Sequence, residues 1–238
     1  MPRFALPTRS AKRLLAAPIV AALLFTATAC GAPGWAPAQT VVPESAVAPM
    51  SPEATAAARQ QLAGLAIKGR APKTGYSREE FGPAWTDVDH NGCDTRNDIL
   101  ARDLATPTFK EGRKQCVVLT GRLSDPYTAT TIDFTRGQGT STAVQIDHVV
   151  ALSDAWQKGA QQLSVEQRTA LANDPANLLA VDGPTNSSKS DGDAATWLPP
   201  NKAYRCQYVS RQITVKSTYG LWVTQAEHDA MDTVLATC

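Results

Sequence analysis

The chain has 238 residues, of which 43% are hydrophobic and 19% are charged, and its formal net charge at neutral pH is +1. This composition supplies enough apolar surface for a folded core, which excludes a wholly disordered chain, and the length suits one domain or two small ones. The near-zero charge also argues against a protein that coats nucleic acid through a strongly basic surface.

Residues 1–29 are typical of an export signal. Four basic residues and no acidic ones precede an almost wholly apolar run, Leu14 to Thr26. This run is too short to span a bilayer comfortably. Small residues then lead to Cys30, which would be the first residue after cleavage. Cleavage leaves 19 basic against 22 acidic side chains, so we expect a mature chain of net charge −3 that is secreted or held on the outer face of the membrane.

Cysteine usage fits an oxidising compartment. Setting Cys30 aside leaves four cysteines, and we prefer the two sequence-local pairings, Cys93–Cys116 and Cys206–Cys238, among three connectivities. Cys30 follows a small residue, as the lipid-carrying cysteine of a bacterial lipobox does, but the usual leucine three positions earlier is absent. A lipid anchor at Cys30, a free thiol and a disulfide to another chain all stay open.

Residues 30–50 are rich in proline and alanine, so we expect a linker before the folded part. Ser51-Pro52-Glu53 combines a cap residue, a first-turn proline and an early acid, which predicts a helix start. The alanine-rich sequence that follows should continue this helix to about Leu65.

The rest of the chain alternates short helical and short extended patterns. Helices are expected over 95–104 and, from a capping-box pattern, over 164–172, and strands over 116–119 and 130–134. We therefore predict one α+β domain over residues 51–238, organised by small sheets and disulfides.

The segment 146–193 carries the residues best suited to chemistry. Asp147 and His148 are adjacent, and Asn177 and Asn186 follow them along the chain. Oxygen donors such as those of Asp147 and Asn186 suit Mg²⁺, and a neutral imidazole at His148 can take a proton from water. This set of residues predicts a hydrolytic site for a phosphate ester.

These motifs resemble those of the HNH endonucleases, also called ββα-metal or His-Me finger nucleases. The Asp-His pair followed by hydrophobic residues is similar to the family's first strand, and Asn177 and Asn186 match the second and third letters of its name. The resemblance extends over about residues 76–223 and points to the secreted bacterial branch of the family. The flanking motifs that carry it are Cys93-Asp94-Thr95-Arg96, Trp156, Gly159-Ala160, Trp197-Leu198-Pro199-Pro200-Asn201 and Tyr204-Arg205-Cys206.

The resemblance implies a ββα-metal core in which Asp147 and His148 lie on a hairpin and Asn186 begins the following helix. His148 would be the catalytic general base, while Asp147 and Asn186 would hold one divalent ion, Mg²⁺ or another such as Mn²⁺. Asn177, assigned with His148 to the catalytic centre, would brace the loop that carries the histidine. Each residue also has a purely structural interpretation. Asp147 and His148 would be neighbours on opposite faces of a strand, Asn177 a turn residue and Asn186 a helix cap.

Basic residues near the motif are candidates for substrate binding through phosphate. They are Lys189, Arg96, Lys202 and Arg205. The acid-free segment 201–220, if helical, aligns along one stripe the residues Lys202, Arg205, Val209, Gln212 and Lys216. A phosphate-binding face and a solvated face are equally good interpretations of its charges. Arg96 could instead pair with Asp94 or Asp98.

Asp87, Asp89 and Asn91 place oxygen donors at alternate positions before a glycine, with Asp98 at the twelfth position. This spacing resembles the start of a calcium loop, and Ca²⁺ is therefore a candidate second ion. The twelfth ligand is usually glutamate, so we favour a polar turn fastened by Cys93.

Together these observations predict an exported, metal-dependent endonuclease that hydrolyses DNA, with RNA as an open alternative. We expect a nucleic acid as its substrate, low sequence specificity because no sequence-reading module is evident, no protein partner, and a monomer. The alternatives are a non-catalytic cell-envelope binding module and a small-molecule phosphodiesterase. The complete set Asp147, His148 and Asn186 argues against the first, and the acid-free segment 201–220 against the second.

Overall fold

The computed structural model describes residues 48–112 and 114–238. The export signal, Cys30 and all but the last three residues of the linker predicted over 30–50 lie outside this part of the chain. Within it, no helix combines the length and the apolar character that crossing a membrane requires.

Helix α1 (Pro52–Gly64) begins where the sequence predicts. The Ser51 side chain accepts a hydrogen bond from the Ala54 amide, and Pro52 occupies the first turn, where a missing amide hydrogen costs nothing. Ala58 and Leu62 bury one side of the helix against the core.

A three-stranded antiparallel sheet follows, in the order β1 (Ala105–Phe109), β2 (Val118–Ser124) and β3 (Thr131–Thr135). Helix α2 (Thr95–Asp103) precedes it and is capped by Asp94. The sequence indicates β2 and β3 but not β1, whose central residue is Pro107. An edge strand tolerates proline because one of its sides has no neighbour to receive hydrogen bonds.

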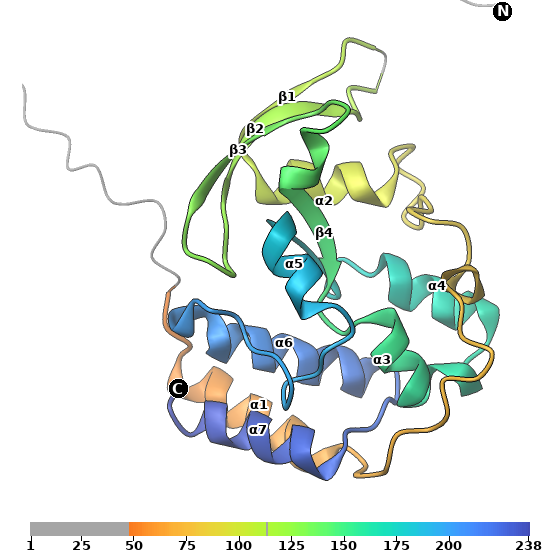
Figure 1. Cartoon of the computed structure of the whole chain (residues 1–238), viewed down its shortest axis with the longest axis vertical. Helices are drawn as coiled ribbons and strands as arrows, with labels where there is room; N and C mark the ends of the chain where they lie inside the picture. The colour runs from red at the N-terminus through yellow and green to blue at the C-terminus, as the bar shows by residue number, and fades with distance from the viewer. Residues whose placement is uncertain (1–47, 113) are drawn as a thin grey trace, which may run out of the picture. The chain divides into compact units, whose positions relative to one another are not determined.

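A β-hairpin followed by a helix stands at the centre of the structure (Figure 1). Strands β4 (Val144–His148) and β5 (Leu178–Asp182) pair antiparallel, and α5 (Gly183–Lys189) follows β5 directly and packs on β4. Glycine is required at 183, because a Cβ there would collide with the carbonyl oxygen of Thr142.

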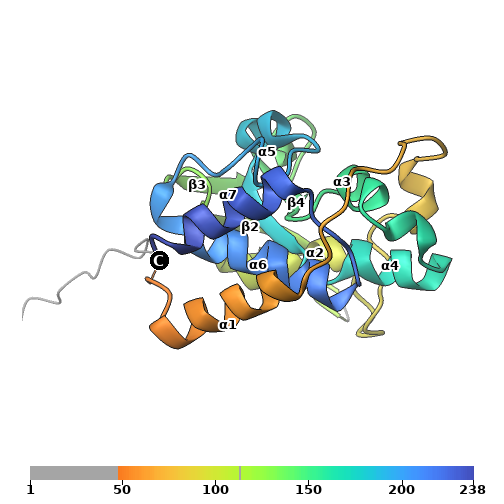
Figure 2. The same cartoon turned by 90° about the horizontal axis from the view of Figure 1, so that it is seen from below.

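The two strands of this hairpin separate two apolar clusters. Val144 and Ile146 face α2 and the three-stranded sheet, whereas Leu179 and Val181 face the helices α1, α6 (Arg205–Thr218) and α7 (Gln225–Leu235). Alternation of side chains along a strand makes this division. Figure 2 shows α6 lying with α1 and α7 as one helical layer. The architecture is α+β, as the sequence predicts.

The connection between β4 and β5 contains α3 (Leu152–Gln157) and α4 (Val165–Asn173). Ser164 and Gln167 form the reciprocal capping box that the sequence predicts at the start of α4. Short 3₁₀ turns complete the described structure: Arg78–Phe81 (η1), Ser141–Ala143 (η2), Ala160–Gln162 (η3) and Lys202–Tyr204 (η4).

Two disulfides join Cys93 to Cys116 and Cys206 to Cys238, with Cα–Cα distances of 5.2 and 5.9 Å. They are the pairings that the sequence favours. The first fastens the loop before α2 to the segment before β2, and the second fastens the start of α6 to the end of the chain. Both distances fall in the ordinary range for a disulfide.

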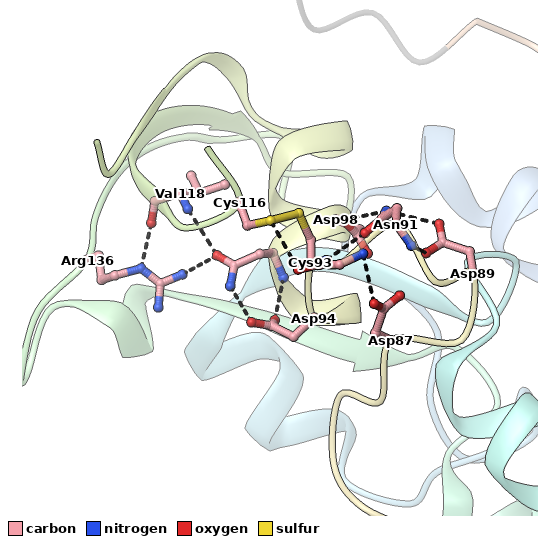
Figure 3. Close-up of a disulfide and its surroundings, with 11 residues drawn as sticks. Asp87, Asp89, Asn91, Cys93, Asp94, Asp98, Cys116, Val118 and Arg136 are labelled. Atoms are coloured by element: carbon pink, nitrogen blue, oxygen red, sulfur yellow. Dashed lines mark hydrogen bonds between the residues drawn. A yellow bond between two sulfur atoms is a disulfide. The ribbon is translucent and has the colours of Figure 1, made fainter. Parts of the chain in front are cut away.

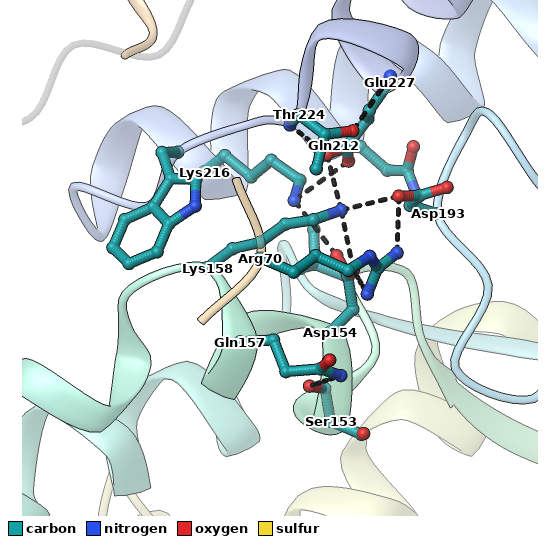
Figure 4. Close-up of polar contacts among 12 residues, drawn as sticks. Arg70, Ser153, Asp154, Gln157, Lys158, Asp193, Gln212, Lys216, Thr224 and Glu227 are labelled. Atoms are coloured by element: carbon teal, nitrogen blue, oxygen red, sulfur yellow. Dashed lines mark hydrogen bonds and ion pairs between the residues drawn. The ribbon is translucent and has the colours of Figure 1, made fainter. Parts of the chain in front are cut away.

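A buried ionic cluster connects α3, α6 and α7 (Figure 4). The Lys158 ammonium lies 2.7 Å from Asp154, 2.7 Å from Asp193 and 2.6 Å from Glu227. Lys216, which is fully buried, pairs with Asp154 and Glu227, and Arg70 adds pairs to Asp154 and Asp193. Burial of the cations is compensated because three carboxylates surround them.

Candidate active site

Asp147 and His148 end strand β4, and their side chains point to opposite faces of the hairpin. The Asp147 carboxylate accepts a hydrogen bond from Tyr127, in the cluster that contains the helices, whereas the His148 ring lies parallel to that of Trp85 on the other side. Both residues nevertheless line one pocket, of about 330 Å³, and Asn186 lines the same pocket. The structure thus brings together at one pocket three of the four residues that the sequence assigns to the catalytic centre and the metal, and the fourth, Asn177, does not line it.

The His148 ring is held in one tautomer. Its Nε2 lies 2.8 Å from the carbonyl oxygen of Ala172, and a carbonyl oxygen can only accept, so Nε2 carries a proton. Burial lowers the pKa of His148 to about 4, although the bond to Ala172 opposes the shift. At neutral pH the imidazole is therefore uncharged and Nδ1 has a lone pair, which is the state that a general base needs.

The Asp147 carboxylate is fixed by two donors. Lys189 Nζ lies 2.9 Å from Oδ1, and the Tyr127 hydroxyl lies 2.5 Å from Oδ2. Lys189 also donates to the carbonyl oxygen of His148. Burial raises the pKa of Asp147, and the charge of Lys189 opposes that shift. Each carboxylate oxygen retains a second lone pair, because Lys189 and Tyr127 use one apiece.

Asn186 lies in α5 and is oriented by β4. Its Nδ2 donates to Gln145 Oε1 at 2.8 Å, so its Oδ1 is the group left for another partner. The resemblance implies that Asn186 begins a helix, whereas it is the fourth residue of α5, which begins at Gly183. Among the described residues, no three His, Cys, Asp or Glu side chains form a group suited to a metal ion. An ion here would therefore depend on Asp147, Asn186 and non-protein ligands.

Asn177 is fully buried and braces the chain after His148. Its Oδ1 accepts from the Val150 amide at 2.8 Å, and its Nδ2 donates to the carbonyl oxygens of Val150 and Leu171, each at 3.3 Å. It lines neither of the two pockets beside His148. The contacts of Asn177 thus hold the backbone at Val150 and Leu171, and its side chain does not line the pocket of His148, Asp147 and Asn186.

The residues that the sequence assigns to substrate binding do not gather at the pocket. Lys189 is buried, and its ammonium already bonds to Asp147 and His148, which leaves it no access to a phosphate. Arg205 donates to the carbonyl oxygen of Pro199, and Lys202 lies exposed in η4. Arg96 is partly buried, with Nη2 3.5 Å from the carbonyl oxygen of Val144.

Segment 201–220 is largely helical, but it does not form a basic surface stripe. Along the expected stripe, Val209 and Gln212 are buried and Lys216 lies in the ionic cluster. Arg211 donates to the carbonyl oxygens of Pro175, Ala176 and Leu178. The charges of this segment therefore hold the fold together, apart from exposed groups such as Lys202.

Cations of a distant segment line the pocket instead. Lys73 and Arg78 precede the Asp147-His148 pair by about seventy residues in the sequence, and they line the same pocket as that pair. Lys73 Nζ lies 3.2 Å from Asp191, whose carboxylate also accepts from Ser153. No spacing pattern in the sequence points to these residues, because tertiary folding alone brings them to β4.

In the loop before α2, side-chain oxygens accept hydrogen bonds from backbone amides of the same loop (Figure 3). Asp87 accepts from the amide of Gly92, Asp89 accepts from the amide of Asn91, and Asn91 accepts from the amide of Cys93. These bonds are those of the polar turn that we favour from the sequence. The disulfide of Cys93 fastens the turn.

Comparisons with known proteins give the family of this chain. Residues 94–234 match the family of GmrSD restriction endonucleases, C-terminal domain, and the chain belongs to this family. The match includes Asp147, His148, Asn177 and Asn186. A protein of the fungus Arthroderma benhamiae, described as an uncharacterized secreted protein, is 37% identical over 205 residues, which cover 84% of this chain and 95% of the relative. No solved structure matches.

Proposed function

We propose that the protein is an exported, metal-dependent endonuclease of the HNH type that hydrolyses phosphodiester bonds in DNA or RNA with low sequence specificity. Membership of a family of nuclease domains supports a nucleic acid as the substrate. The observation that carries the proposal is the tautomer of His148, which leaves Nδ1 as the acceptor, in a residue that lines one pocket with Asp147 and Asn186.

The residues present fit a divalent ion. Asp147 and Asn186 offer a carboxylate and an amide oxygen, and Mg²⁺ is typically held by one or two such groups with water and substrate phosphate completing its shell. The Lys189 ammonium partly neutralises the negative charge of the Asp147 carboxylate. The divalent ion should therefore bind weakly until the substrate phosphate adds its negative charge. When bound, the ion would neutralise charge that develops on the phosphate and on the leaving 3′ oxygen.

His148 supplies the proton transfer in this scheme. Its Nδ1 takes a proton from a water molecule, the water oxygen forms a bond to phosphorus, and the bond from phosphorus to the 3′ oxygen breaks. The 3′ oxygen takes a proton from solvent to become a hydroxyl, and the imidazolium returns its proton to solvent. Asn177 keeps the backbone after His148 in place, and Ala172 keeps the ring from turning. Arg78, which is exposed at the same pocket, supplies positive charge for the phosphate.

Plasmid cleavage tests the proposal. The mature chain should nick and linearise plasmid DNA with Mg²⁺ or Mn²⁺ and should be inactive with EDTA. His148→Gln keeps a group that can donate to Ala172 but removes the proton acceptor, so we expect a loss of about 100-fold or more. His228→Ala is the matched control, because His228 lies outside the pocket.

Three outcomes would contradict parts of this scheme. No cleavage by the wild type with any divalent ion would reject the nuclease function. Undiminished cleavage by His148→Gln would reject His148 as the base, and cleavage in EDTA would reject the metal. Hydrolysis of a small phosphodiester, such as bis(p-nitrophenyl) phosphate, without plasmid cleavage would favour a small-molecule phosphodiesterase.

Export has its own support and test. The two disulfides fit an oxidising compartment, and the fungal relative is described as secreted. The mass of the mature N-terminus distinguishes a lipid-modified Cys30 from a free or disulfide-bonded one.

A further inference from the structure

A second pocket adjoins the candidate active site. His148, Leu152 and Arg78 line both pockets, and the second is completed by Glu79, residues 81–85, Ala172 and Asn173. Its volume is about 350 Å³. This is the low end of the range for small-molecule sites, so the pocket suits one small ring system and not a protein segment.

The wall of this second pocket is largely apolar and aromatic. Phe81, Pro83 and Trp85 contribute to it, and the indole of Trp85 is within 11° of parallel to the imidazole of His148, with the ring centres 6.2 Å apart. Trp85 has a φ of 59°, in the left-handed region that bulky residues rarely adopt. Such a conformation persists only where the surroundings impose it, and it is found most often at functional sites.

The wall is also held rigidly. Arg168 in α4 donates to the carbonyl oxygen of Glu80 at 2.6 Å, which ties η1 to α4. Gly82 has a φ of 79°, and a Cβ there would collide with Thr169. Because these contacts set the wall before any ligand arrives, little ordering is left to oppose binding.

Polar groups at this pocket suit a nucleotide. Asn173 is buried, and its Oδ1 has no hydrogen-bond partner among the described residues, which is a costly state for an acceptor. This oxygen is enclosed, so an amino group of a base could supply the missing donor only if the Asn173 side chain turns towards the pocket. Arg78 is exposed where the two pockets meet, so its guanidinium can approach a phosphate beside His148.

We infer that this pocket takes the nucleobase adjacent to the scissile phosphodiester, which stacks on Trp85 while its phosphate lies between Arg78 and His148. The inference rests on the proposed function, because it assumes that the phosphate beside His148 belongs to a nucleic acid. Only one sugar separates a base from its phosphate. When the base lies in this pocket, its phosphate therefore lies in the adjoining pocket of Asp147, His148 and Asn186. Cleavage should then depend on the presence of a base and not only on the backbone.

Binding without cleavage tests this inference. The full chain is titrated in EDTA with dAMP or with deoxyribose 5-phosphate, which lacks the base, and the indole N–H signals are followed by NMR. The Trp85 signal is identified from Trp85→Phe. We expect dAMP to shift this signal and to bind about tenfold or more tightly than the sugar phosphate.

Two variants separate stacking from folding. Trp85→Leu should weaken dAMP binding about tenfold, while Trp85→Phe, which keeps an aromatic face, should stay close to the wild type. Val88→Ala, an exposed position on the same loop, should bind as the wild type does. Unfolding by urea shows whether each variant is folded under the conditions of the titration.

The outcomes distinguish this inference from the proposed function. Equal binding of dAMP and the sugar phosphate, a Trp85 signal that does not respond to millimolar dAMP, or unchanged affinity in a folded Trp85→Leu would overturn the inference even if plasmid is cleaved. Base-dependent binding at Trp85 by a chain that cuts no plasmid would leave the base pocket standing and reject only the nuclease.

Discussion

Lys189 Nζ lies 2.9 Å from Asp147 Oδ1, and both side chains are buried. The same ammonium donates to the carbonyl oxygen of His148, so one lysine holds both residues of the Asp-His pair. An ion pair of this kind contributes little net stability when intact, but removal of one partner leaves a buried charge without compensation.

Replacement of Lys189 by methionine should therefore destabilise the protein by about 3–5 kcal/mol, measured by urea unfolding. Lys189→Met combined with Asp147→Asn should recover much of that loss, because no uncompensated charge remains. A double variant no more stable than Lys189→Met would show that the lysine acts through packing and not through charge.

The tautomer of His148 can be observed directly. Long-range ¹H–¹⁵N NMR at neutral pH should show a neutral ring with a proton on Nε2 and none on Nδ1, because Nε2 donates to Ala172 and burial disfavours the cation. His90, which is exposed, provides a comparison within the same spectra. A proton on Nδ1 at neutral pH would contradict the role of this nitrogen as acceptor.

Asn177→Asp should be strongly destabilising although the shape is conserved. The carboxylate can still accept from Val150, but it cannot donate to the carbonyl oxygens of Val150 and Leu171, which it would repel. We expect a loss of about 2–4 kcal/mol in the free energy of unfolding. A nearly neutral effect would mean that the brace is dispensable.

The ionic cluster should make stability depend on acid pH. Burial alone would raise the pKa of Asp193, but its hydrogen bond with Lys158 and the charges of Lys158 and Arg70 outweigh burial and lower it from 3.8 to about 2. The folded state thus binds its proton less readily than the unfolded state, and the contribution of Asp193 is present above the unfolded pKa and is lost as the pH falls towards 2.

The measurement compares wild type with Asp193→Asn. The difference in their free energies of unfolding should be constant near neutrality and should shrink by about 2 kcal/mol between about pH 5 and pH 2. A difference that does not change over this interval would show that the charge of Asp193 does not contribute.

The loop of Asp87, Asp89 and Asn91 tests the calcium alternative. One oxygen of each of these side chains already accepts from an amide of the same loop, and of their oxygens only Asp87 Oδ1 is buried without a partner among the described residues, so we expect millimolar Ca²⁺ to leave the unfolding temperature unchanged. Asp89→Ala serves as the control. A rise in unfolding temperature that Asp89→Ala abolishes would instead support the calcium site suggested by the spacing.

Local features of this protein follow from the sequence alone. The cap at Ser51, the capping box at Ser164 and the start of α2 at Thr95 are set by residues within one helical turn, and they appear as predicted. The Asp-His pair and Asn186 fall on a pair of antiparallel strands and the helix after it, as the family resemblance implies, although α3 and α4 lie between the two strands in the chain.

Tertiary structure decided which charges lie inside. Lys189 and Lys216 have the sequence context of exposed helical residues, yet both are buried, since carboxylates distant in sequence meet their ammonium groups in the folded chain. Arg78 and Trp85 reach His148 only because η1 packs on α4. The spacing of residues along the chain does not predict these contacts, because they depend on how the elements pack. The free energy of burying a charge depends in turn on the partners that packing supplies.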